Sequence, residues 1–264
     1  MFRNPIALEF AKHGQLRMSE DVDYRFMAGE AFVPFVLDET AEIAREYPIV
    51  FPVNQGDIPF AVIALQPGHT AYLDEKGRWL ARYVPASVRS YPFRFGRIPG
   101  KEPGAGDRRV VLLDPDAPHF RGTGGDVLFT VDGKLSTPVA RRMALLEAME
   151  RSLVRTQHVV RAIAAEGLLV EAPIHIKTGA GTGHRITGVR VVDEQRLNGL
   201  SDQSAGALCR VGAFRLIHAH LLSRVNFRLG PLASKSSPMD VDAGVRPGGG
   251  FFGDTATIDF SSLS

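Results

Sequence analysis

Short apolar runs, alternating with polar positions and bounded by Gly, Pro and Asp residues, fill the first half of the chain. Such runs predict antiparallel β-strands. The strand candidates are "YPIVFPV", "PFAVIAL", "TAYLDEKGRWLARYV", "SYPFRFGRI" and "RRVVLLD". In the third of them, "DEKG" at 74–77 separates two aromatic-rich arms, so we expect a hairpin turn there. The stretch 101–107 contains Pro and Gly and is expected to be a surface loop.

Residues that favour helix ends indicate three helices, apart from the long helix described below. The sequence "ETAEIARE" at 39–46 predicts a helix that Asp38 caps, and the helix ends because Pro48 holds the preceding residue extended. Further along the chain, Asp193 is expected to cap a short turn of helix. Ser201 is expected to cap a longer helix, "DQSAGALCRVGAFRLIHAHLLSRVNF".

A long helix is predicted at 138–166, where apolar positions recur every three or four residues. Thr137 can cap this helix, Pro138 suits its first position, and Gly167 marks its C-terminal end. At 1.5 Å per residue, such a helix would be roughly 43 Å long.

The apolar stripe of this long helix is interrupted by two polar residues, Arg142 and Thr156. The interruptions argue against an extended coiled coil, which needs an unbroken apolar seam. We therefore expect the helix to pack along a sheet. The stripe consists of Val139, Leu146, Met149, Leu153, Val160 and Ile163.

After the long helix, "LLVEAPIHIK" and "HRITGVRVV" predict two strands of a hairpin at 168–192. They flank "TGAGTG" at 178–183, which we interpret as the hairpin loop. The alternative, a phosphate-binding loop, would need a strand-to-helix context and a Lys that this segment lacks. From Leu229 the composition shifts to Gly, Ser, Pro and Asp, so 229–264 is expected to be a weakly ordered tail or one that docks on a partner.

Together these elements predict a single α+β domain over residues 1–228. An antiparallel-rich mixed sheet from 30–130 and the hairpin at 168–192 would pack against two helices, 138–166 and the C-terminal 202–226. Elements of both kinds bury their apolar faces only against one another, which favours one shared core.

Composition narrows the possible functions. The chain has 264 residues, with 31 basic against 29 acidic side chains and a net charge of +2. Such a balance lacks the global basic footprint of a nucleic-acid-binding protein, and we expect no nucleic-acid partner. The basic residues cluster locally between residues 77 and 109. A run of this kind is either a solvated face or an anion site.

The single cysteine, Cys209, excludes an intramolecular disulfide and a thiolate zinc cluster. It lies in the apolar pattern of the last predicted helix, so we expect it to be buried. The longest clear apolar run, "FAVIAL", is far shorter than the roughly 18 residues of a membrane span. The N-terminal segment also lacks an apolar stretch of signal-peptide length. We therefore expect a soluble, cytoplasmic protein.

The stretch "GRWLARYVPASVRSYPFRF" at 77–95 contains the only Trp, four Arg and four further aromatic residues. Alternate residues of a strand share a face, so Trp79 and Tyr83 are expected to face the core while Arg82 faces water or a ligand. Beyond them, the same parity places Arg89 beside aromatic rings. There its guanidinium would bond to a carboxylate or to backbone carbonyls, or bind an anion. The candidate residues for binding an anion or a partner are Trp79, Arg82, Tyr83, Arg89, Tyr91 and Arg94.

Two further groups of residues are candidates for chemistry. The segment "DPDAPH" at 114–119 offers two carboxylates and an imidazole, but its two prolines favour an acidic turn over a metal site. His218 and His220 lie two positions apart in a predicted helix, so they should not share a metal ion. Each is a possible acid or base, with a core or interface role as the alternative. We find no cofactor-binding motif and expect neither a metal nor a cofactor.

Several blocks, in this order and spacing, resemble the SapC family of bacterial proteins. They are "EYPIVF", "GRWLARYVPASVRSYPF", "LFTVDGKLS", "GVRVVDEQRLNGLSD" and "GAFRLIHAHLLS". The resemblance covers roughly residues 5 to 230. Ser87 and Ser90 stand where the family pattern carries an aromatic residue and a second Arg, which weakens the double-Arg character here.

The resemblance implies no particular reaction, and the surface-layer label in the family's name is not a mechanism. It does imply a Gram-negative host and a role in the uptake or modification of an imported substrate. Family members are associated with TonB-dependent receptors, flavin-dependent halogenase-like proteins and cupin-like proteins. A partner protein of the halogenase-like or cupin-like kind is therefore expected.

Three functional hypotheses follow. The first is a non-catalytic accessory protein that binds a partner protein or a small anionic ligand. The second is an enzyme acting on a small anionic metabolite or peptide, with Arg82, Arg89 and Tyr91 in recognition and a His in proton transfer. That version requires the named groups to converge on one pocket. The third is a surface-layer or secretion component.

Overall fold

The structure is a computed structural model that describes residues 1–20, 23–54, 56–65, 68–98, 107–121, 124–177, 183–234 and 241–242. Helices and antiparallel sheets form one domain, which confirms the predicted α+β class. The helices are α1 (Phe10–His13), α2 (Thr40–Glu46), α3 (Ala86–Arg89), α4 (Thr137–Ala165), α5 (Glu194–Asn198), α6 (Asp202–Arg210), α7 (Ala213–Ser223), α8 (Asn226–Leu229) and α9 (Pro231–Ser234). The strands are β1 (Ile6–Ala7), β2 (Arg17–Met18), β3 (Phe32–Pro34), β4 (Ile49–Pro52), β5 (Phe60–Val62), β6 (Phe93–Ile98), β7 (Arg108–Leu113), β8 (Asp126–Val127), β9 (Leu169–Glu171), β10 (Ile174–Lys177), β11 (Gly183–Ile186), β12 (Val189–Val192) and β13 (Val241–Asp242).

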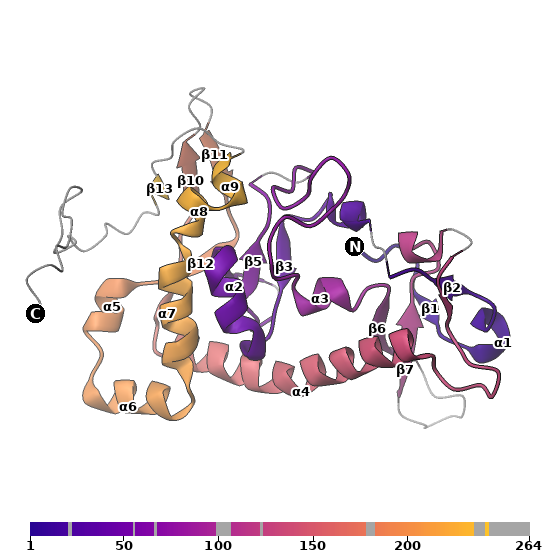
Figure 1. Cartoon of the computed structure of the whole chain (residues 1–264). Helices are drawn as coiled ribbons and strands as arrows, with labels where there is room; N and C mark the ends of the chain where they lie inside the picture. The colour runs from indigo at the N-terminus through magenta and orange to yellow at the C-terminus, as the bar shows by residue number, and fades with distance from the viewer. Residues whose placement is uncertain are drawn as a thin grey trace, which may run out of the picture.

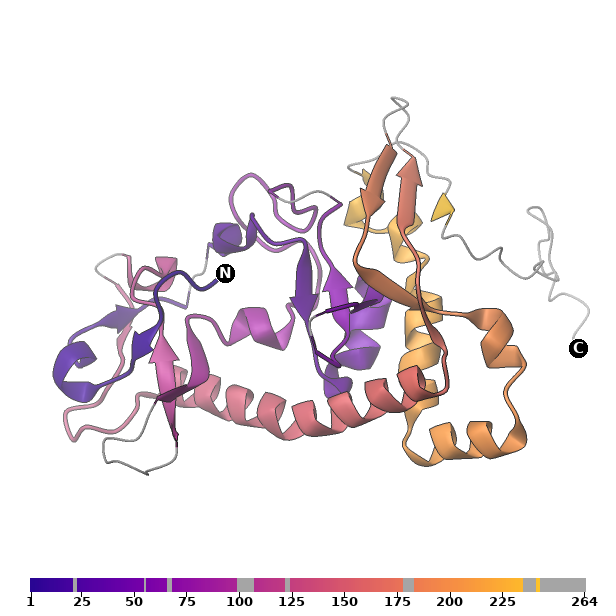
Figure 2. The ribbon, with the colours of Figure 1, turned by 180° about the vertical axis from the view of Figure 1, so that it is seen from behind.

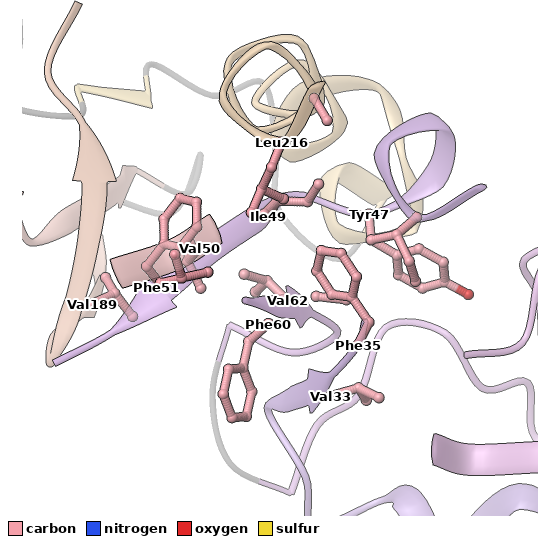
Figure 3. Packing of buried hydrophobic residues seen from close by; sticks show 14 of the residues in the cluster. Val33, Phe35, Tyr47, Ile49, Val50, Phe51, Phe60, Val62, Val189 and Leu216 are labelled. Carbon is pink, nitrogen blue, oxygen red and sulfur yellow. The ribbon is translucent and has the colours of Figure 1, made fainter. Parts of the chain in front are cut away.

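A five-stranded antiparallel sheet in the order β3-β5-β4-β12-β9 forms the main layer (Figure 1). Its strands come from both halves of the chain, since β4 pairs with β12 and Val189 lies opposite Pro52. Helix α7 packs against β4, β12 and α2. Figure 3 shows the apolar side chains that fill this core, with Leu216 of α7 pointing toward Ile49 of β4.

A second, smaller sheet in the order β1-β7-β6 lies at the other end of the molecule and has its own apolar cluster. Helix α4 passes along both ends (Figures 1 and 2). Its N-terminal half contributes Val139 and Leu146 to the smaller cluster, and its C-terminal half contributes Val160 and Ile163 to the main core. We expected α4 to pack along a single sheet. It instead joins two cores.

The polar interruption at Thr156 has a structural role. Its side-chain oxygen accepts a hydrogen bond from the backbone N–H of Leu37 at 3.0 Å and donates to the carbonyl of Ser152 at 2.8 Å. A buried hydroxyl with both bonds made fixes the contact between α4 and the short 3₁₀ helix that precedes α2.

Two of the predicted helix caps are wrong. Asp38 lies inside the 3₁₀ turn and pairs with Arg155 instead. The buried Glu39 carboxylate accepts the backbone N–H at the start of that turn, at 3.2 Å. The long helix begins one residue early, so Ser136 occupies the cap position and Thr137 is the first helical residue. The first error arises because a tertiary partner, Arg155, competes for the Asp38 side chain, whereas the second is a shift of one residue in the start of the helix.

Downstream, Asp193 and Ser201 cap α5 and α6 as predicted. The continuous helix expected at 202–226 is wrong, because Gly212 adopts a φ of +73° and separates α6 from α7. This left-handed conformation suits a residue without Cβ. The hairpin predicted at 168–192 is present in two sections, β9 with β12 and β10 with β11.

The predicted turn at 74–77 forms, with the N–H of Asp74 donating to the carbonyl of Arg78 at 3.1 Å. Its arms make only an isolated bridge between Leu73 and Trp79 instead of the expected strand pair. Most of the predicted loops at 101–107 and 178–183 lies outside the described residues. So does the predicted tail, except for residues 229–234 and 241–242.

Candidate anion-binding pocket

Exposed and core-facing side chains alternate between residues 78 and 83, as predicted. Trp79 and Tyr83 pack against the main core, and the Trp79 Nε1–H donates to the Tyr47 hydroxyl at 2.8 Å. Arg82 is exposed, and its guanidinium contacts no partner among the described residues. The rings in this segment therefore hold it to the core.

Arg89 lies in a helical turn, α3, and not in a strand, so the strand parity expected for it is wrong. Its Nε–H donates to the carbonyl of Val84 at 2.8 Å, and its Nη2 donates to the Tyr83 hydroxyl at 3.0 Å. That hydroxyl in turn donates to the buried Glu39 carboxylate at 2.9 Å. This chain of bonds fixes one side of the Arg89 guanidinium and leaves the group exposed.

Tyr91 is buried, and its hydroxyl donates to Asp114 at 3.2 Å. Burial, followed by the charge of Asp114, raises the pKa of Tyr91 well above its usual range. Asp114 also accepts the backbone N–H of Asp116 at 3.2 Å, so "DPDAPH" forms the acidic turn that its prolines indicate. Arg94 is exposed, with its guanidinium carbon 5.1 Å from the centre of the Phe2 ring.

A cavity of about 550 Å³ lies where α3, α4 and the 3₁₀ turn Pro118–Phe120 meet. Three guanidinium groups and one carboxylate line it, together with an imidazole, a phenol and two apolar side chains. The lining residues are Glu20, Tyr24, Val88, Arg89, His119, Arg141, Arg142 and Leu145. Arg89 is the one sequence-predicted site residue that the structure places here.

Arg142 is largely buried, with 14% of its side chain exposed. Its Nε has no hydrogen-bond partner among the described residues, and its only ion pair joins Nη1 to a Glu20 oxygen at 3.9 Å. Burial lowers the pKa of Arg142, and the Glu20 charge partly opposes that shift. A charge removed from water with so weak a partner is poorly compensated.

His119 is 4% exposed, and within the described chain its Nδ1 also has no hydrogen-bond partner. Burial lowers the pKa of His119 to about 4, and the Arg142 charge acts in the same direction. The imidazole is therefore neutral near pH 7. Two nitrogen atoms of residues that line the cavity, Arg142 Nε and His119 Nδ1, are therefore buried and have no hydrogen-bond partner within the described part of the protein.

Neither of the two predicted acid–base candidates lines this cavity, and the two have different surroundings on α7. His218 is exposed and its ring lies 5.7 Å from that of Phe214. His220 is fully buried, with Nδ1 donating to the carbonyl of Ile49 at 2.8 Å and Nε2 accepting from Val192 N–H at 3.1 Å. His220 therefore joins α7 to two strands of the central sheet. The expectation that the pair would not share a metal ion agrees with these orientations.

Cys209 is exposed on α6, so its predicted burial is wrong, and Leu208 is the buried residue there. Among the described residues, no group of three or more His, Cys, Asp or Glu side chains could hold a metal ion. The helices in the described ranges include none that is long and apolar enough to cross a membrane.

The sequence interpretation missed most of the pocket. Arg142 was noted as an interruption of the apolar stripe, and that position was the available signal, since a cation on a buried face needs a partner. His119 belongs to the segment that was interpreted as a turn. Glu20 and Tyr24 carry no local signal, because only the tertiary fold brings them beside α4, and Arg141 is one of several charged residues of α4 itself.

The fold and the cavity define an α+β protein with two apolar clusters joined by one helix and a cationic pocket beside that helix. The SapC family model matches residues 8–229, so the chain belongs to the SapC family. No curated protein and no solved structure matches the chain.

Proposed function

We propose that this protein is a non-catalytic accessory protein that binds a small anionic ligand in the pocket beside α4. The observation that carries the proposal is the largely buried Arg142, whose only ionic partner among the described residues is the Glu20 carboxylate at 3.9 Å. Removing a cation from water costs on the order of several kcal/mol unless an anion and hydrogen bonds compensate it. An oxyanion in the pocket would supply both.

The other lining groups favour the same ligand. Arg89 and Arg141 bring two further guanidinium groups, whose planar forks match carboxylate and phosphate oxygens. Arg89 is already held in place by Val84 and Tyr83, so little side-chain entropy is lost when it binds. Val88 and Leu145 add apolar surface to the wall, which suits an organic acid.

The low pKa of His119 favours a binding function over a catalytic one. A general base works best when its pKa lies near the working pH, and the pKa of His119 is about 4. The enzyme alternative also required Arg82, Arg89, Tyr91 and a histidine to converge. Of its three recognition residues only Arg89 lines this cavity, and neither His218 nor His220 does.

The wider role rests on the family. Handling of an imported substrate together with a halogenase-like or cupin-like partner protein in the cytoplasm of a Gram-negative bacterium fits a small-acid-binding accessory protein. The bound acid would then be the substrate or product that the partner receives.

Calorimetric titration with malate tests the pocket. We expect binding to the unmodified protein and at least about tenfold weaker binding to Arg142→Met, because a charge-assisted hydrogen bond is lost. Arg151→Met removes an exposed charge from the same helix and should leave the affinity unchanged. Equal affinity in both variants would contradict the proposal, and turnover of the bound acid by the isolated protein would favour the enzyme alternative.

A further inference from the structure

One carboxylate, that of Glu20, stands among the three guanidinium groups of the pocket. Arginine side chains only donate hydrogen bonds, whereas the ionised Glu20 carboxylate only accepts them. Its oxygen lies 3.9 Å from Arg142 Nη1, and 56% of its side chain is exposed. Glu20 is therefore the more exposed partner of this ion pair, and Arg142 is the more buried one.

The Glu20 carboxylate beside the arginines should make the affinity of an anion depend on whether the anion carries a proton. A fully deprotonated anion held by the arginines would place a second negative charge beside Glu20, with no proton between the two. An anion that carries its own hydroxyl can donate that proton to Glu20 while its charged oxygens accept from Arg89 and Arg142. A site that is built to hydrogen-bond a ligand hydroxyl rejects analogues that lack it.

We propose that the pocket selects small organic acids that carry a proton donor next to the anionic group, as 2-hydroxy acids do, and that Glu20 is the residue that sets this selectivity. The inference rests on the proposed anion-binding function. The roughly 550 Å³ cavity and its apolar residues Val88 and Leu145 fit an organic acid better than an inorganic ion.

Two matched pairs of probes test the selectivity by calorimetry at about pH 8. Malate and succinate differ in one hydroxyl group, and hydrogenphosphate and sulfate share shape and double charge but differ in one proton. We expect the hydroxyl-bearing member of each pair to bind at least about tenfold more tightly. In Glu20→Gln the repulsion is removed and the amide can donate, so this preference should disappear.

Glu147→Gln, an exposed change on α4, serves as the control and should keep the preference. Equal affinities within both pairs for the unmodified protein, or a preference that persists in Glu20→Gln, would overturn the assignment of selectivity while leaving the anion pocket standing. Binding of none of the four probes would overturn both proposals.

Discussion

Replacement of Arg142 by Met should stabilise the unliganded protein, although it removes an ion pair. Arg142 is 14% exposed, its Nε lacks a partner among the described residues, and Glu20 lies at 3.9 Å. Replacing buried ion pairs by apolar residues is often neutral or stabilising by about 1–4 kcal/mol. Because both side chains keep some contact with solvent, the lower end applies, and we expect a gain of about 1 kcal/mol.

For a chain of this size, such a gain corresponds to a rise in Tm of about 2–4 °C. The released Glu20 carboxylate costs little, because it is more than half exposed. Unfolding in urea, followed by circular dichroism in an anion-poor buffer, measures the difference between Arg142→Met and the unmodified protein. Arg151→Met is the matched control and should lie within about 0.5 kcal/mol of the unmodified protein.

When malate is present, the unmodified protein should become more stable than Arg142→Met. A ligand at 100 times its Kd adds about 2.7 kcal/mol to the unmodified protein and little to the variant. Two results would refute the reasoning. One is a clear loss of stability in Arg142→Met without ligand, which would mean that internal contacts already compensate the buried charge. The other is an equal gain from malate in both proteins.

Two further predictions concern the site and its surroundings. Tyr83→Phe removes the hydroxyl between Glu39 and Arg89. It should lower the unfolding free energy by about 1–3 kcal/mol and weaken malate binding. An unchanged affinity by calorimetry would show that the Val84 carbonyl alone positions Arg89. The unfolding free energy should also fall as the pH drops from 6.5 toward 4, because His119 and His220 have folded pKa values of about 4 and the unfolded chain takes up their protons first. Each histidine contributes up to about 1.4 kcal/mol of unfolding free energy per pH unit. Urea unfolding of His119→Gln at several pH values should therefore give a shallower dependence of this free energy on pH. The same dependence as in the unmodified protein would contradict this account.

Local patterns predicted the elements whose ends and faces depend on neighbouring residues. The long helix was placed to within one residue at its start, and Asp193 and Ser201 cap their helices as expected. The alternation from Arg78 to Tyr83 also holds, because burial of the rings requires it even without a strand ladder.

The pocket could be predicted only in part. Arg89 was selected for its aromatic neighbours, and it does line the cavity, although from a helical turn. Arg142 and His119 belong to segments that were interpreted as helix face and turn. Their relation depends on how the 3₁₀ turn around Pro118 packs beside α4, and sequence spacing contains no information about that contact.

The sequence by itself determined the class of fold, the long helix and the family, because period, capping residues and motif order are properties of neighbouring positions. The tertiary structure decided that β4 pairs with β12, that one helix joins two cores, and that three arginines, a carboxylate and a neutral imidazole line one cavity. These contacts join residues far apart in the chain, and they exist because burying the apolar faces of α4 and the two sheets brings those residues together.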